Sequence, residues 1–231
     1  MKLEITIPES WADIKLSDYL EYAKSLRPYE GSEEYPLVVY EKALNHFCNI
    51  GSEDLRALPM ENYNGLINYI KELFEAQQDM PVALSFEIAG TKYGFLPKLD
   101  DMTYGEYLDL SIYSKDLWKN LATFISILYR PVTKEDKKGN YEIEPYNGTN
   151  ENTIELFKHA LTMDIGWGAI GFFIRLQKDL LNAMVTYSIQ SLKMIEKDSQ
   201  LLETLTKNGV DISVLQSCQE TILQSSKQLQ D

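Results

Sequence analysis

The stretch DLWKNLATFISILYRPVTKEDKKGNYEIEPY, residues 116–146, decides the fold of this 231-residue chain. Its first part predicts a helix from Asp116 to Tyr129, because apolar residues recur at helical spacing on one face. Pro131 ends this helix, since proline lacks the amide hydrogen that a helix interior needs. Residues 132–146 then predict a β-hairpin or a flexible arm, whose charged tip at 134–140 is too polar to be packed in an isolated monomer.

Upstream of this stretch, the spacing predicts one strand followed by helices. Residues 2–7 alternate apolar and polar side chains, which is the period-two pattern of a short, half-buried strand. Ser17 has the character of an N-cap for a short helix, and Pro36 is well placed in the first turn of another helix. Apolar residues at positions 66–74 form a stripe with helical spacing. Residues 1–79 are therefore predicted to form a strand plus three or four helices.

The pattern changes after Pro81, where a first β-hairpin is predicted. Residues 84–95 alternate apolar and polar side chains on both sides of an Ala89-Gly90-Thr91 turn. Thr103 followed three residues later by Glu106 is a capping box, in which each side chain bonds the other residue's amide. The next helix is therefore predicted to begin at Thr103.

The C-terminal third predicts further helices. Asn150 caps a helix over residues 153–160, and a long helix runs from Asp164 toward Ile195. Three glycines at the start of this long helix let another backbone approach closely: Gly166, Gly168 and Gly171. Sparse apolar residues over 212–229 predict a last amphipathic helix, which would be weakly stable without a partner.

These elements place the chain in the mainly α class with small β-hairpins (α+β). The prediction is a helical domain with an extended β arm at 131–147 and a long C-terminal helix. Residues 1–79 and 80–231 form two domains, or the chain is one continuous domain.

Composition and charge narrow the classes of function. The net charge of −13 argues against binding to phosphate backbones, which needs clustered lysine and arginine, so no sequence-specific nucleic-acid partner is expected. The most apolar window, residues 165–174, is too short for the roughly twenty residues of a membrane span, so the chain is expected to stay soluble after synthesis in the cytoplasm. Fifteen tyrosines suit either core edges or surfaces that become buried in a complex.

Side chains with reactive chemistry are few and scattered. His46 and His159 lie near helix ends without a nucleophile at motif spacing, and structural roles are favoured for both. Asp100-Asp101 could be a paired carboxylate for acid–base work or cation binding, but a solvated turn before a helix is favoured. Cys48 and Cys218 fit buried single thiols better than a disulfide or a metal site. We therefore expect no enzyme activity, no cofactor and no metal.

Several segments together resemble a group of small tailed-phage proteins encoded among virion genes, particularly in crAss-like phages and relatives that infect Bacteroidetes hosts. The resemblance covers roughly residues 1–185, and Tyr129-Arg130-Pro131 after an apolar helix is its most distinctive feature. The segments that carry it are residues 5–19, 99–110, 127–132, 141–146 and 163–165.

This resemblance implies a non-catalytic phage protein at the portal or tail, either a ring subunit of the virion or a tail-assembly chaperone that the virion does not retain. A small cytoplasmic enzyme is the third alternative. The arm, the edge strand at residues 2–7 and the sparse last helix favour the ring, because a ring subunit needs two different complementary faces. The expected partners are further copies of the chain and other portal or tail proteins, with no membrane, and the expected location is the virion.

Six residues are candidates for subunit interfaces in such a ring. Arg130 either caps the end of its helix or forms a salt bridge across a subunit boundary. The interface candidates are Tyr129, Arg130, Tyr141, Ile143, Tyr146 and Phe172.

Overall fold

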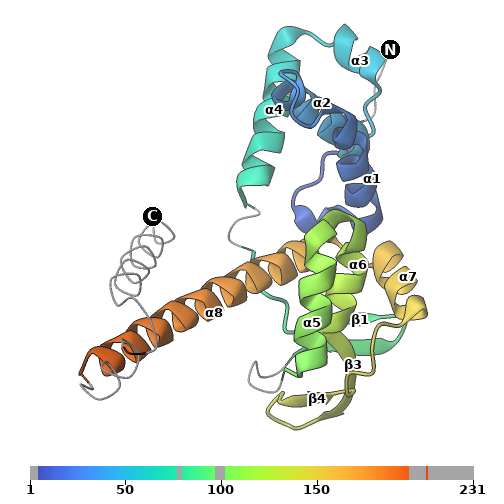
Figure 1. Cartoon of the computed structure of the whole chain (residues 1–231). Helices are drawn as coiled ribbons and strands as arrows, with labels where there is room; N and C mark the ends of the chain where they lie inside the picture. The colour runs from blue at the N-terminus through green and yellow to red at the C-terminus, as the bar shows by residue number, and fades with distance from the viewer. Residues whose placement is uncertain (1–4, 77–79, 97–101, 198–206, 208–231) are drawn as a thin grey trace. The chain divides into compact units, whose positions relative to one another are not determined.

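The computed structural model describes residues 5–76, 80–96, 102–197 and 207 (Figure 1). The protein is mainly helical with a small four-stranded antiparallel sheet and a long C-terminal helix, which confirms the predicted α+β class. The chain divides into two compact units, residues 1–171 and residues 172–231, and each is described by itself.

Helices form the N-terminal part of the first unit. After a 3₁₀ turn at Trp11–Asp13, they are α1 (Leu16–Leu26), α2 (Tyr35–Phe47), α3 (Ser52–Ala57) and α4 (Met60–Glu75). Pro36 lies in the first turn of α2, as predicted. Trp11 is fully buried, and its indole nitrogen donates a hydrogen bond to the Leu73 carbonyl at 2.8 Å. This bond fixes the turn at Trp11–Asp13 against the last part of α4.

Two predictions for the N-terminal segment are wrong in the described residues. Residues 5–7 lie in no strand, and residues 2–4 of the predicted strand lie outside the described residues. Helix α1 has its N-cap at Lys15, two residues before the predicted N-cap Ser17. The cause is long-range, because the Leu16 amide donates to the Leu161 carbonyl and the Met163 amide donates to the Ile14 carbonyl, both at 2.8 Å.

The two predicted hairpins exist, and they join into one sheet. The strands are β1 (Ser85–Ile88), β2 (Thr91–Phe95), β3 (Tyr129–Glu135) and β4 (Tyr141–Ile143), in the order β1-β2-β3-β4. Ala89 and Gly90 both have positive φ, as a two-residue hairpin turn requires. Strand β3 pairs with β2 through Phe95 opposite Tyr129, so the arm begins inside the sheet.

The remaining helices begin and end close to their predicted bounds. They are α5 (Tyr104–Tyr113), α6 (Leu117–Leu128), α7 (Glu151–Ala160) and α8 (Met163–Lys197). The predicted capping box of α5 is formed by Thr103 and Glu106, and the Asn150 side chain caps α7. The last helix predicted from the sequence, over 212–229, lies outside the described residues.

Elements on both sides of residue 80 share one core, so the first unit has no boundary there. The rings of Trp11 and Tyr19 pack against Trp167, and Tyr19 also packs against Trp118, with ring centres 5.3–5.5 Å apart. These ring contacts lie within the unit of residues 1–171, and the predicted domain organisation stays a prediction.

Gly168 confirms the prediction of a close backbone approach at the start of α8. A Cβ at this position would lie 2.5 Å from the Pro81 carbonyl oxygen and 3.3 Å from the Val82 Cα. Only glycine therefore lets the segment before β1 lie directly on the helix.

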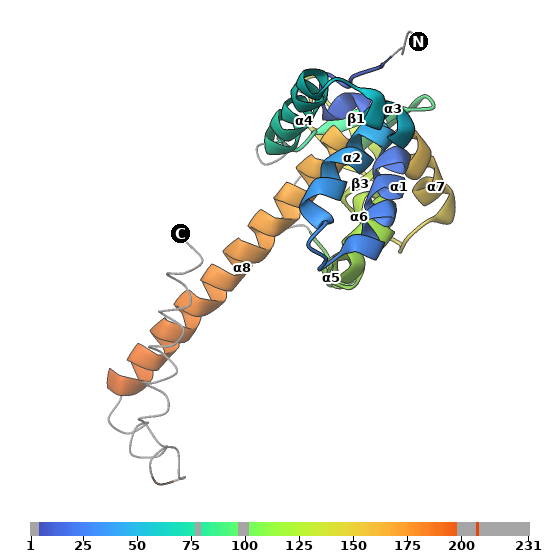
Figure 2. The ribbon, with the colours of Figure 1, turned by 90° about the horizontal axis from the view of Figure 1, so that it is seen from above.

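The second unit contributes the larger part of α8 to the described residues. Figure 2 shows α8 as a single continuous helix, in agreement with its bounds. Residues 172–197 carry four basic side chains and two acidic ones, whereas the whole chain has a net charge of −13.

Candidate functional site

The side chains with reactive chemistry do not assemble in the described part of the chain. His46 packs against the Tyr22 ring, and burial lowers its pKa, whereas His159 is exposed beside Glu155 at 3.4 Å. Cys48 is buried, which raises the pKa of its thiol to about 11 and makes it a poor nucleophile. Among the described residues, no group of three or more histidine, cysteine or acidic side chains could hold a metal ion. Asp100-Asp101 and Cys218 lie outside the described residues.

Two pockets in the first unit do not bring histidine or cysteine side chains together. One of about 390 Å³ lies between α2, α3 and α4 and has Glu41, Lys42 and Arg56 on its wall. Another of about 260 Å³ lies beside the base of the arm and includes Arg130 and Glu144. Neither pocket has a histidine or cysteine on its wall.

Arg130 lies at the base of the arm and finds its partners within the chain. Its guanidinium forms an ion pair with Glu106 of α5, and its Nη1 donates to the Ile127 carbonyl at 3.3 Å. Its Cζ also lies 5.6 Å from the centre of the Tyr146 ring. The bond to Ile127 is the helix-end contact that one of the two predictions for Arg130 describes. In the single chain its ion pair is formed with Glu106, and a salt bridge across a subunit boundary stays a prediction.

The ion pair between Arg130 and Glu106 is buried, since the two side chains are 12% and 3% exposed. Burial alone would raise the pKa of Glu106, but hydrogen bonds with Thr103 and the Arg130 guanidinium together hold it below its ordinary value. The Thr103 amide donates to Glu106 Oε2 at 2.6 Å. Glu106 thus joins the start of α5 to the start of β3.

Three tyrosines among the interface candidates also make bonds within the chain. Tyr129 is fully buried and donates its hydroxyl proton to the Ala83 carbonyl at 2.8 Å. The Tyr141 hydroxyl lies 2.7 Å from the Leu84 carbonyl oxygen and 2.9 Å from that of Phe95, and Tyr146 donates to Asp109 at 2.5 Å. In the single chain these side chains fasten the arm to its own sheet and to α5.

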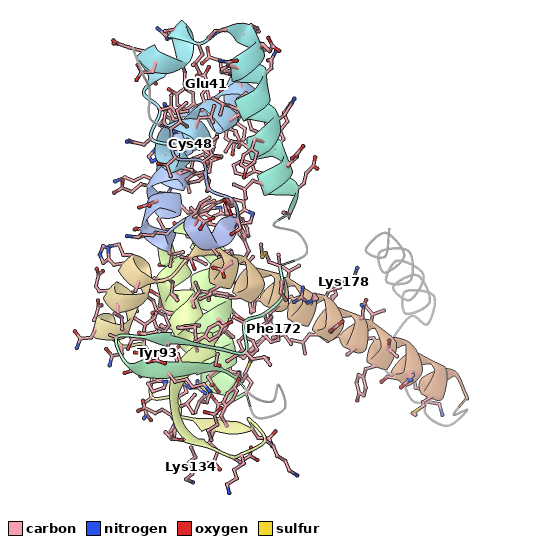
Figure 3. All side chains as sticks on the ribbon, turned by 180° about the vertical axis from the view of Figure 1, so that it is seen from behind. Glu41, Cys48, Tyr93, Lys134, Phe172 and Lys178 are labelled. Atoms are coloured by element: carbon pink, nitrogen blue, oxygen red, sulfur yellow. The ribbon has the colours of Figure 1, made fainter. Side chains whose placement is uncertain are left out.

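The other two interface candidates are half-buried. Ile143 lies on the short strand β4, and Phe172 is the first residue of the second unit. Figure 3 shows Phe172 and, at the end of the β3–β4 hairpin, Lys134. A role of any of the six candidates in an interface stays a prediction.

The tip of the arm is closed by its own hydrogen bonds. The Asp136 carboxylate accepts from the amides of Lys138 and Asn140 and from the Asn140 side chain, at 2.8–2.9 Å. These bonds lower the pKa of Asp136. The tip is exposed to solvent, as its charge predicts, yet it has a defined turn rather than a loose loop.

An apolar surface on α5 is a feature that the sequence reading missed. Four large side chains of this helix are between 39% and 78% exposed; we call them the α5 face: Tyr104, Tyr107, Leu108 and Ile112. The two charged residues of α5 lie on its inner side, because Glu106 is buried and Asp109 is half-buried under Tyr146. This is the reverse of an ordinary surface helix, which turns its charges toward water.

The second unit has a comparable surface on α8. Six of its large apolar side chains are between 39% and 73% exposed; we call them the α8 face: Ile174, Leu180, Leu181, Met184, Tyr187 and Met194. The spacing from Leu180 to Met184 and Tyr187 is four and then three residues, which places these side chains along one stripe of the helix. The signal for both faces was present in the sequence, but spacing alone does not say which side of a helix is covered.

Comparisons with protein-family models, curated proteins and solved structures found no match to this chain. None of the helices in the described ranges is long and apolar enough to cross a membrane.

Proposed function

We propose that this protein is a non-enzymatic structural subunit of a tailed-phage virion, which forms a homo-oligomeric ring or connector at the portal or tail. The observation that carries the proposal is the exposure of ten large apolar side chains on two helices, the α5 face and the α8 face. Large contiguous apolar surfaces on a protein commonly mark sites where another protein binds. The sequence resemblance to small phage virion proteins supports the proposal that the subunit assembles at the portal or tail of a virion.

Two properties of the structure favour a ring over a simple pair. The α5 face belongs to residues 1–171 and the α8 face to residues 172–231, so each copy carries two unlike apolar surfaces. Unlike surfaces that bind each other join copies head to tail, and such contacts close into a ring when the rotation between copies allows it. The arm adds a third exposed element that can reach a neighbouring subunit.

The first test is the state of the purified full-length protein. Sedimentation velocity and native mass spectrometry are expected to find one closed oligomer of defined mass, whose fraction rises with protein concentration. A protein that stays monomeric at high concentration, without any other phage component, would contradict the proposal.

The second test concerns the virion. Mass analysis of purified particles is expected to find the protein in several copies per particle. A tail-assembly chaperone would instead be found in infected cells bound to a tail protein and would be missing from mature particles, so that result would replace the ring with the chaperone.

A further inference from the structure

The segment that connects β4 to α7 contains an asparagine followed by glycine, Asn147-Gly148. We propose that Asn147 is a site of spontaneous chemical modification, at which its side-chain amide is lost and aspartate or isoaspartate is formed. Water is the only co-reactant. The chain has two other Asn-Gly pairs, of which Asn64-Gly65 lies in α4 and Asn208-Gly209 lies outside the described residues.

The reaction begins at the backbone nitrogen of the residue that follows asparagine. This nitrogen loses its proton to base and attacks the side-chain carbon Cγ, so that an N–Cγ bond forms, the Cγ–Nδ2 bond breaks and the side-chain nitrogen leaves as ammonia. Water then opens the cyclic imide at either of its carbonyl carbons, which gives an ordinary aspartate or an isoaspartate whose backbone runs through Cγ. Glycine favours the first step, because it has no Cβ to hinder the attack.

The surroundings of Asn147-Gly148 leave this reaction open in the folded protein. Both residues are exposed and belong to no helix or strand. Within the part of the chain that the structure describes, neither the Asn147 side chain nor the Gly148 amide forms a hydrogen bond. The backbone here can therefore rotate until the nitrogen reaches Cγ, without breaking any bond of the fold.

The Asn64-Gly65 pair is a matched counterpart within the same chain. Its two residues are also exposed, but they lie in the first half of α4. In a helix the Gly65 amide donates to the carbonyl four residues earlier, and the backbone at Asn64 is held at a ψ of about −42°. Ring closure needs a different ψ, so α4 must first open locally. Exposure to water is thus the same at the two pairs, whereas the hydrogen bonding of the backbone differs.

The product would change the base of the arm. Asn147 lies in the wall of the pocket of about 260 Å³, together with Arg130 and Glu144. Loss of the amide adds a carboxylate to this wall, close in sequence to Tyr146, whose ring lies against Arg130. Isoaspartate also lengthens the connection from β4 to α7 by one backbone carbon. The modification therefore alters both the charge of the pocket and the length of the segment beside it.

The test follows the full-length protein during incubation at mildly alkaline pH and physiological temperature. Peptide mapping by tandem mass spectrometry measures the fraction of each asparagine in which –NH2 has been replaced by –OH, and electron-transfer fragmentation separates isoaspartate from aspartate. Asn147 is expected to convert at least about tenfold faster than Asn64, because α4 must open before Gly65 can react. The rate at Asn147 should rise with pH, because the attacking nitrogen must lose its proton.

Two controls separate the effect of the fold from that of the sequence. In the same protein unfolded by urea, Asn64 and Asn147 should convert at similar rates, because glycine follows both. In Asn147→Gln the fold should be unchanged, since the side chain is exposed and makes no bond, and conversion at this position should stop, since the longer side chain disfavours the ring. Gly148 is kept, because its φ of +90° would strain any other residue.

Two results would overturn the inference. Equal rates at Asn64 and Asn147 in the folded protein would show that the hydrogen bonding of the backbone does not select the site. An Asn147 that stays intact in the folded protein, while the unfolded protein reacts, would show that the fold holds this segment in an unreactive conformation. The proposed function is independent of both results, because it is tested by the assembly state and by the composition of the virion.

Discussion

Arg130 and Glu106 join two elements that are far apart in the sequence, and their burial makes the pair sensitive to loss of either partner. Glu106→Gln keeps the shape of the side chain but leaves a buried guanidinium without a counter-charge. We expect the free energy of unfolding to fall by about 3 kcal/mol, as for other broken buried pairs. Glu142→Gln is the control, because the Lys134–Glu142 pair is exposed and its loss should change stability by less than about 0.5 kcal/mol. Chemical denaturation measures both changes, and equal effects of the two substitutions would contradict the buried role of Glu106.

The same pair predicts a pH dependence. Because the pKa of Glu106 in the folded protein lies below its ordinary value, its ionised form stabilises the fold. That contribution is fully present above the unfolded pKa of about 4.3 and is lost as the pH falls through the lower folded value. The stability difference between the unsubstituted protein and Glu106→Gln should therefore be constant near neutral pH and shrink below about pH 4. A stability difference between the two proteins that grows as the pH falls would have the opposite sign and would contradict this prediction.

Two glycines lie in helices with different surroundings, so replacing each by alanine should have opposite effects on the stability of the protein. Gly168→Ala would push a methyl group into the Pro81 carbonyl, and we expect a loss of about 1–3 kcal/mol from the resulting shift. Gly65 lies exposed in α4 with nothing within 4 Å of an added Cβ, so Gly65→Ala should raise stability by about 0.5–1 kcal/mol. Thermal unfolding measures both, and a stabilising Gly168→Ala would show that the approach of the two backbones is not tight.

At the scale of elements, Tyr141 ties strand β4 to the rest of the sheet. Its ring covers Gly94, where an added Cβ would lie 2.5 Å from a ring carbon, and its hydroxyl reaches two carbonyls beside β1 and β2. Tyr141→Phe should cost about 1 kcal/mol and speed hydrogen exchange at β4 more than at β2. Gly94→Ala should displace the ring and loosen the arm further. Unchanged exchange at β4 in Tyr141→Phe would mean that packing alone holds the arm.

Elements whose signals are local could be predicted from the sequence. Thr103 and Glu106 meet because they are three residues apart, and the Ala89-Gly90 turn fixes its own hairpin. The pairing of β2 with β3 was not predictable in this way, since Phe95 and Tyr129 are brought together by the helices between them. The start of α1 was misplaced for the same reason, because a backbone contact with Leu161 sets it.

The α5 face and the α8 face show the same limit of prediction from the sequence. Spacing identifies an apolar stripe on a helix, but only the packed structure shows that Glu106 is turned inward and that Tyr104 and Ile112 are left in water. Arg130 shows a related limit. Its position in the sequence left open a salt bridge to another subunit, and in the fold Arg130 forms an ion pair with Glu106 of the same chain. Long-range contacts decide whether a residue is buried in the core or exposed at the surface, and the periodicity of the sequence carries no information about those contacts.

At the scale of the whole molecule, both proposed contact surfaces lie within residues 104–194, although the chain continues to residue 231. A chain shortened to residues 1–197 is therefore expected to form the same oligomer as the full-length protein, because neither face loses a residue. Sedimentation velocity at matched concentrations measures this, and Met184→Glu with Tyr187→Glu in the shortened chain is the control that should abolish assembly. A shortened chain that stays monomeric would place residues 198–231 in the subunit contact, and α5 and α8 would then be insufficient to hold two copies together.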